Sequence, residues 1–402
     1  MSICDSLCIV CNGKQWLRLP PSHPTRSVRS DGAILNRPLA KAQCNDCGMI
    51  QSCEVPAQET LESLYTDHYD IYNKRPDSEQ FVTGRYRSLA QAIVSSVAPL
   101  IPKRVLEVGC GNGAALQAVS ALWSEAKCVG MEPVTSAVNA AQAHGINAYQ
   151  GMIGGTIPEV ISKHQYDVIY TIHVIEHTGN PIRYLEGLKA MLAPGGRLIV
   201  TTPNSRQPNL EIMRTDHHYS MLPYHLNVIA RKAGLMPIKS TLCPGGGEDL
   251  DYEHNQLLVC SLPQITDAID QFPTLPDELN PEHRTVLFAA RKKYFDDFSA
   301  LDDTLLQRFA DAKDIVCFGT GGWTCMLAGY APQAWNRVRA CVIDGGSSNE
   351  FYGKKILPYS IVIEKKPDIV LVGINPATQP IIVRRLEADQ IPSARWDDII
   401  AM

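Results

Sequence analysis

The sequence of 402 residues contains no apolar run that approaches the ~20 residues needed to span a bilayer. Its N-terminus lacks a basic start followed by an apolar core, so we expect no signal peptide. Basic residues are not in excess either, because 37 Lys and Arg stand against 42 Asp and Glu. A dedicated nucleic-acid-binding protein usually shows a basic excess. These absences predict a cytoplasmic protein whose partner is neither a membrane nor a nucleic acid.

Length and composition indicate a globular protein of several domains. Hydrophobic residues make up 45% of the chain and charged residues 20%, which is ordinary for such proteins. A chain of 402 residues is long for one domain, so we expect two or three.

A glycine-rich turn at residues 107–113 is the most informative motif. It reads Glu-Val-Gly-Cys-Gly-Asn-Gly, follows the apolar segment 104–106, and precedes a helix predicted to begin at Ala114. Glycines in such a turn let backbone N–H groups approach a ligand with no Cβ in the way. A second acid, Glu132, closes the next predicted strand, where it can accept hydrogen bonds from a ribose diol.

The acid that precedes the glycines distinguishes between two nucleotide ligands. Glu107 would repel the pyrophosphate of NAD but can face the sulfonium of S-adenosylmethionine. We therefore expect Glu107 and the glycines around the methionine part of that cofactor, and Glu132 at the ribose. Two methionines are expected beside the adenine, and one histidine is expected buried behind the cofactor. The predicted cofactor-binding residues are Glu107, Gly109, Gly111, Gly113, Met131, Glu132, Met152 and His173.

The segment resembles the nucleotide-binding turn of class I methyltransferases. The resemblance continues through residues 166–170 and 174–177 and ends at 192–200. The whole run from about 105 to 235 is similar to that fold.

Thirteen cysteines are present, and only those near the N-terminus have the spacing of metal ligands. Two Cys-x-x-Cys pairs are separated by 32 residues, and four thiolates complete a tetrahedral structural zinc site. The predicted ligands are Cys8, Cys11, Cys44 and Cys47, with Cys4 and Cys53 as less suitable substitutes. Free thiols or a single disulfide are the alternatives, and a reducing compartment disfavours the disulfide.

A second α/β unit is predicted in the C-terminal third, after a helical stretch at about 281–311. Strand-like segments at 314–318, 338–344 and 366–373 alternate with helices, and the first is followed by a glycine turn. A ligand would lie at the carboxyl ends of these strands, unless the unit serves only for packing. The expected fold is thus α/β, with a zinc-binding domain at 1–60, a methyltransferase domain at 61–262 and a Rossmann-like domain at 263–402.

With these three parts in this order, the chain resembles the three-domain bacterial sugar C-methyltransferases, which act on nucleotide-linked keto-deoxysugars. The resemblance implies that His177 matches the histidine after the fourth core strand, and that Asp216 and His217 fall on the family's acid and base. A tyrosine from the connector also enters the family's active site, and Tyr69 and Tyr72 are the candidates. The chain departs from the family at Asp216, where glutamate is usual, and at Arg214, where tyrosine is common.

Methylation of a carbon next to a ketone requires a base that removes the α-proton and a donor that stabilises the enolate oxygen. We expect His217 as the base, Asp216 as its orienting carboxylate, and His177 or a connector tyrosine as the donor. A solvent-exposed loop or a second metal site are alternatives for residues 216–218. Other functions remain open: O- or N-methylation of a sugar, glycan or small metabolite, methylation of RNA or protein, and cofactor binding without catalysis. The expected partner is a small molecule, and a monomer is plausible.

Overall fold

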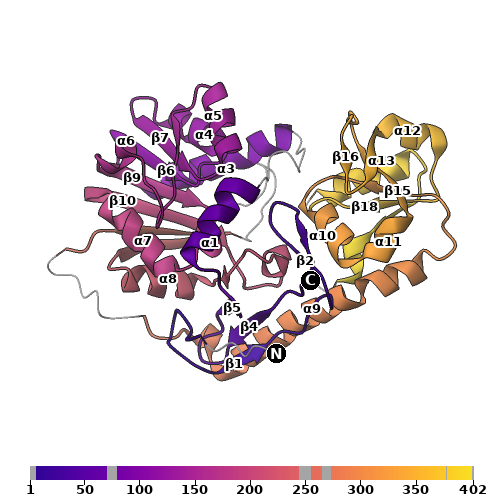
Figure 1. Ribbon diagram of the computed structural model, residues 1–402, viewed down its shortest axis with the longest axis horizontal. Coiled ribbons are helices and arrows are strands. Elements are labelled where there is room, and N and C mark those ends of the chain that lie inside the picture. The colour runs from indigo at the N-terminus through magenta and orange to yellow at the C-terminus, as the bar shows by residue number, and fades with distance from the viewer. Residues whose placement is uncertain (1–5, 70–78, 244–254, 265–272, 377, 401–402) are drawn as a thin grey trace.

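The structure is a computed structural model that describes residues 6–69, 79–243, 255–264, 273–376 and 378–400. Its strands form sheets of four, seven and six strands and one two-stranded hairpin. The two larger sheets belong to separate α/β units, and the small sheet lies near the long helix that connects them (Figure 1). The predicted α/β class, with two Rossmann-like sheets, is confirmed. No helix among the described residues is long and apolar enough to cross a membrane.

The four-stranded sheet combines segments that are far apart in the sequence. Its order is β1 (Trp16–Arg18), β4 (Lys41–Cys44), β5 (Ile50–Ser52) and β11 (Tyr219–Ser220). Strand β11 follows the Asp-His-His motif at residues 216–218 and pairs antiparallel with β5. Between β1 and β4 the chain forms a hairpin of β2 (Ser27–Val28) and β3 (Ile34–Leu35), called here the β2–β3 hairpin.

The central sheet has seven strands in the order β12-β13-β10-β9-β6-β7-β8, and β10 to β8 run parallel. The strands are β6 (Arg104–Val108), β7 (Lys127–Glu132), β8 (Ala148–Gln150), β9 (Tyr166–Ile172), β10 (Leu192–Pro203), β12 (Met236–Cys243) and β13 (Asn255–Ser261). The accompanying helices are α3 (Glu79–Ser96), α4 (Ala114–Leu122), α5 (Thr135–Ala143), α6 (Glu159–Ser162), α7 (Pro181–Ala190) and α8 (Pro223–Lys232). The strand order reverses at β6, so a ligand-binding crevice is expected at the carboxyl ends of β6, β7 and β9.

Helix α7 shows how local sequence positions these elements. The side chain of Asn180 accepts hydrogen bonds from the backbone N–H groups of Ile182 and Arg183, and Pro181 occupies the first helical position. Asparagine at the cap and proline in the first turn are the preferred start of a helix. Helix α7 therefore begins at a defined residue beside the crevice.

The C-terminal sheet has the order β16-β17-β15-β14-β18-β19, with five parallel strands and β16 antiparallel at one edge. Its strands are β14 (Ile315–Phe318), β15 (Val338–Ile343), β16 (Glu350–Phe351), β17 (Lys354–Pro358), β18 (Ile369–Val372) and β19 (Ser393–Arg395). Its helices are α10 (Gly322–Tyr330), α11 (Pro332–Arg337), α12 (Tyr359–Lys365) and α13 (Gln379–Ala388). The strands expected after residues 314, 338 and 366 are all present.

Helix α9 (Pro281–Arg308) joins the parts through a shared core. Its buried aromatic residues, among them Phe298, pack in one cluster with Val28 of the hairpin, Met213 of the central part and Trp396 of the C-terminal part. All three parts of the sequence thus contribute to one hydrophobic cluster. The division at residues 60 and 262 stays a prediction.

Candidate active site

A cavity of about 780 Å³ opens at the carboxyl ends of the central strands. Its wall includes the glycine turn, the end of β7, the segment after β9, and helices on both sides of the central sheet. The lining residues used below are Tyr65, Tyr69, Glu107, Gly109, Gly111, Glu132, Met152, His173 and His177. This is the volume of a site for a small molecule, and it lies where the strand order predicts a ligand.

The glycine turn meets the requirements that its sequence predicted. Gly109 has φ +78°, and a Cβ there would come within 2.3 Å of Val174 Cγ2. Gly111 has φ +53° and donates its backbone N–H to Oε2 of Glu132 at 2.9 Å. Gly113, with φ +81°, is different, because it faces Ile146 and Ala141 and does not line the cavity. The third glycine therefore lets the start of α4 pack closely against α5 and the segment that precedes β8, and its expected contact with a cofactor stays a prediction.

The two acids at the strand ends are buried. Burial raises the pKa of Glu107 to about 8, against the lowering effect of the hydrogen bond donated by Tyr170. Burial also raises the pKa of Glu132, although backbone N–H groups of Val134 and Gly111 donate to its carboxylate. A positively charged ligand in the cavity would oppose both effects and favour ionised Glu107.

The other expected cofactor contacts divide between cavity and core. Met152 and His173 line the cavity. Met131 does not, because its side chain is fully buried in the core under the sheet. The alternation of side chains along β7 explains this placement, since neighbours of Glu132 on the strand point to the opposite face.

The connector after the N-terminal sheet contributes aromatic rings to the cavity wall. Helix α1 (Gln58–Ser63) continues into a short π-helix (Leu64–His68), and Tyr65 and Tyr69 reach the cavity. Tyr65, which the sequence reasoning did not single out, has its ring centroid 6.2 Å from that of His177. Its buried hydroxyl has no hydrogen-bond partner among the described residues. Tyr72, the other expected tyrosine, lies outside the described residues.

His177 is held by Asp216 at the cavity wall. It ends a 3₁₀ helix (Ile175–His177) that follows β9. Its Nδ1 lies 3.0 Å from the backbone carbonyl oxygen of Asp216 and 3.4 Å from the carboxylate Oδ2 of the same residue. Because a carbonyl oxygen can only accept, Nδ1 carries the proton, and Nε2 of the neutral ring keeps its lone pair.

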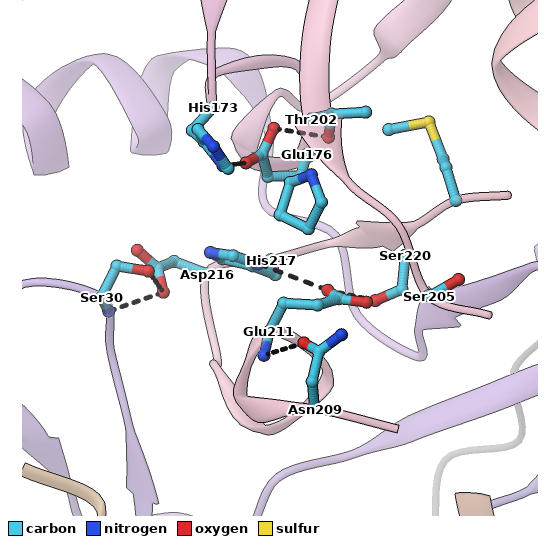
Figure 2. A network of polar contacts seen from close by, with 12 residues as sticks. Ser30, His173, Glu176, Thr202, Ser205, Asn209, Glu211, Asp216, His217 and Ser220 are labelled. Carbon is cyan, nitrogen blue, oxygen red and sulfur yellow. Dashed lines mark hydrogen bonds and ion pairs between the residues drawn. The ribbon is translucent and has the colours of Figure 1, made fainter. Parts of the chain in front are cut away.

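His217 lies behind His177. The two rings are edge to face, with centroids 4.6 Å apart, and neither His217 nor Asp216 is part of the described cavity wall. In Figure 2, His217 points toward Glu211, whose Oε2 is 3.4 Å from Nδ1 of His217 and accepts a hydrogen bond from Ser220. The structure thus brings the three predicted residues together but puts His177 nearest the cavity, because residues 216–218 run into β11 beneath it.

A further carboxylate completes this network. Oε2 of Glu176 accepts from Oγ1 of Thr202 at 2.9 Å, and Oε1 lies 3.3 Å from Nδ1 of His173 (Figure 2). One possible ligand atom each of Glu176, His177 and His217 lies within 4.8 Å of the others. Oε1 of Glu176 has no hydrogen-bond partner among the described residues, and we interpret the group as a polar network.

The charges of the network are set by burial and by the histidine–aspartate contact. Burial alone would lower the pKa of His177, but the hydrogen bond to Asp216 and the nearby carboxylates outweigh it and raise that pKa above 6.5. Burial opposes ionisation of Asp216, yet His177 and the neighbouring positive groups hold its pKa well below 3.8. For His217, burial and the charge of His177 lower the pKa well below 6.5. Burial raises the pKa of Glu211 to about 7.

The four predicted metal ligands converge near the N-terminus. Possible ligand sulfurs of Cys8, Cys11, Cys44 and Cys47 all lie within 4.8 Å of one another, and two S···S distances are 3.6 and 3.5 Å. Four thiolates at ~2.3 Å from a tetrahedral zinc ion are separated by roughly 3.8 Å, so the donor set fits that ion. Of the suggested substitutes, Cys53 is disulfide-bonded and Cys4 lies outside the described residues. The backbone carbonyl oxygen of Cys47 is 2.8 Å from Nε2 of His225, which joins this cluster to α8.

Comparisons with known proteins find matches to parts of this chain. Residues 82–235 match the family described as methyltransferase domain. "Ubiquinone biosynthesis O-methyltransferase" of Cereibacter sphaeroides (strain KD131 / KCTC 12085) is 24% identical over 186 residues, which are 42% of this chain and 74% of that protein. "Probable tocopherol O-methyltransferase, chloroplastic" of Oryza sativa subsp. japonica is 29% identical over 151 residues, 36% of this chain and 39% of that protein. The structure of the plantazolicin methyltransferase BpumL in complex with SAH covers 51% of this chain and 95% of its own, with 16% identity and a TM-score of 0.40.

The family match covers the glycine turn, both acids and the polar network. Residues 82–235 are therefore similar to methyltransferase domains, and the expectation of a methyltransferase enzyme is confirmed.

Proposed function

We propose that this chain, as an S-adenosylmethionine-dependent methyltransferase, methylates a carbon next to a carbonyl group of a small acceptor, with His177 as the base. The observation that carries the proposal is that His177, paired with Asp216 behind it, lines the cavity that Glu107, Gly111 and Glu132 also line. When bound, S-adenosylmethionine supplies a methyl group activated by its positive sulfur. The residues fit this cofactor, because Glu132 can accept from ribose hydroxyls and Glu107 can face the positive charge.

In this mechanism His177 removes the α-proton of the acceptor at Nε2. Asp216 holds Nδ1–H, which keeps the correct tautomer and stabilises the positive ring that forms. The role of base moves from His217 to His177 because the ring of His177 lines the cavity and that of His217 does not. His217 and Glu211 then support His177 from behind.

A donor is also needed for the enolate oxygen. The hydroxyl of Tyr65 is buried at the cavity and has no partner among the described residues. Burial raises its pKa well above 10, so the hydroxyl stays protonated and can donate. We assign Tyr65 this role, with Tyr69 beside it at a ring distance of 4.9 Å.

For the acceptor we propose a nucleotide-linked keto-deoxysugar, and for the four-cysteine cluster a structural zinc ion. The first rests on the resemblance to the sugar C-methyltransferases, and the second on the convergence of Cys8, Cys11, Cys44 and Cys47. A cytoplasmic location accords with such a substrate.

The test is deuterium exchange at the α-carbon of a panel of nucleotide-linked keto-sugars in D₂O without methyl donor. We expect exchange with wild-type protein and its loss in His177→Gln, with S-adenosylmethionine affinity unchanged by calorimetry. If no sugar exchanges while the cofactor binds, C-methylation of this class is excluded. Exchange that persists in His177→Gln and stops in His217→Asn would return the role of base to His217.

O-methylation is the second candidate, and the names of the relatives favour it. The same His177–Asp216 pair would remove the proton of an acceptor hydroxyl. NMR of the methylated product distinguishes the two, because a methyl group on oxygen and one on carbon have different ¹³C shifts.

A further inference from the structure

The β2–β3 hairpin contacts the carboxylate that orients His177. The backbone N–H and the Oγ of Ser30 donate to Oδ1 of Asp216 at 2.8 and 2.9 Å (Figure 2). The other oxygen, Oδ2, faces Nδ1 of His177 at 3.4 Å. Ser30 and Asp216 are 6% and 3% exposed. The hairpin therefore determines which carboxylate oxygen is available to the histidine.

Backbone contacts fasten the same hairpin to the central part. The N–H of Thr215 donates to the carbonyl oxygen of Val28 at 2.9 Å, and Val28 forms an isolated bridge with Arg214. Arg29 pairs with Asp31 and donates to the carbonyl oxygen of His68, at the end of the aromatic connector, at 2.9 Å. The hairpin thus touches the segment that carries Asp216 and the aromatic connector that carries Tyr65 and Tyr69.

On its other side the hairpin packs against the C-terminal part. A Cβ on Gly329, in α10, would come within 2.2 Å of Val28 Cγ2, and Tyr352 donates its hydroxyl hydrogen to the carbonyl oxygen of Gly32. Val28 is fully buried in a cluster with residues of α10. In Figure 1 β2 lies beside α10, between the two larger units.

We propose that the β2–β3 hairpin is a positioning element and that the C-terminal part, through α10 and Tyr352, holds Ser30 against Asp216 and so orients His177. Among the described residues, the C-terminal part supplies none to the cavity wall. Its contribution to the reaction is therefore indirect. The part of this proposal that concerns catalysis by His177 rests on the proposed function. The part that concerns the position of Asp216 rests on the contacts alone.

The energetic reason is the burial of an ionised carboxylate. A buried charge requires hydrogen-bond donors, and Ser30 supplies two of them to one oxygen. If the hairpin moves away, Asp216 turns toward other donors and its contact with Nδ1 of His177 is lost. The effect should appear in the titration of His177, which a purely structural role of the hairpin would leave unchanged.

The experiment compares Gly329→Ala and Ser30→Ala with wild type in the full chain. The readouts are the pKa of His177 from NMR of its ring, kcat, and the affinity for S-adenosylmethionine. Both variants should lower the pKa of His177 and reduce kcat by about tenfold, with unchanged cofactor affinity. Ser30→Thr keeps the hydroxyl, so its pKa of His177 and its kcat should be close to those of wild type.

Two controls separate displacement of the hairpin from a general loss of structure. Gly345→Ala lies in the same C-terminal part with no atom within 4 Å of the added Cβ, so it should behave as wild type. Val28→Ala, combined with Gly329→Ala, removes the clashing methyl group and should restore kcat. A pKa of His177 that is unchanged in both Gly329→Ala and Ser30→Ala would overturn the proposal. Wild-type kcat in His177→Gln would instead refute the role of His177 as base. The pKa of His177 in Gly329→Ala and Ser30→Ala would still test whether the hairpin positions Asp216.

Discussion

Nδ1 of His177 lies 3.0 Å from the backbone carbonyl oxygen and 3.4 Å from the carboxylate Oδ2 of Asp216. The histidine follows β9 and the aspartate precedes β11, so the pair exists only because the chain returns to the central sheet at this place. One residue thus supplies both the acceptor that selects the tautomer and the charge that stabilises the protonated ring.

The first prediction concerns the pH dependence of turnover. Asp216 raises the pKa of His177 above 6.5, so a base at this position becomes active as the pH rises through that raised value. Asp216→Asn removes the charge and leaves burial to dominate, so the pKa of His177 should fall and the acid limb of kcat should move to lower pH. The change should also reduce kcat by roughly 10²-fold or more, because the neutral amide no longer stabilises the protonated ring that forms when His177 takes the proton. A pH–rate profile of both proteins is the measurement, and an unmoved limb would contradict the assignment.

The second prediction compares the two histidines. His177→Gln should reduce kcat by about 10²–10⁴-fold, which is the usual contribution of a general base. His217→Asn should have a smaller effect, because His217 supports His177 and does not line the cavity. Calorimetry should show the same S-adenosylmethionine affinity in both. Equal losses of kcat in both variants would mean that the two rings act as one unit.

The third prediction concerns cofactor binding. Glu132→Gln should weaken S-adenosylmethionine binding by about tenfold or more, because a hydrogen bond to a charged group contributes ~1.5–3 kcal/mol. Glu132 also accepts from Gly111 and Val134, so thermal unfolding should be measured beside calorimetry. Glu159→Gln, an exposed change in α6, is the matched control. Wild-type affinity in a folded Glu132→Gln protein would remove this residue from the ribose site.

The fourth prediction concerns the cysteine cluster. The purified protein should contain about one zinc ion per chain, held by four thiolates. Cys44→Ser should lose the metal and lower the unfolding temperature, because the cluster supports β4 and, through Cys47, contacts α8. Cys128→Ser, at a half-buried position outside the cluster, should keep the zinc. Elemental analysis decides, and full zinc content in Cys44→Ser would refute the four-cysteine site.

Features that depend on neighbouring residues were predictable from the sequence. The glycine turn, the acid that ends β7 and the two Cys-x-x-Cys pairs each depend on a few consecutive positions, and the structure places them as expected. Side-chain direction was less predictable. The side chain of Met131 points into the core, and Gly113 packs against Ile146, because strand alternation and helix packing decide what the neighbours of a ligand-binding residue contact.

The sequence by itself determined the α/β class and the place of the glycine turn between β6 and α4, because periodicity and turn chemistry are local properties of the chain. Only the tertiary structure decided that His177 lines the cavity and His217 does not, and that Tyr65 also lines the cavity. It also decided that Ser30 donates hydrogen bonds to Asp216. The physical reason is that these contacts join segments that are far apart in the sequence, 39 residues apart for His177 and Asp216 and 186 for Ser30 and Asp216. No pattern in the sequence predicts which of two rings that lie side by side in the fold, His177 or His217, faces the cavity after such segments have packed together.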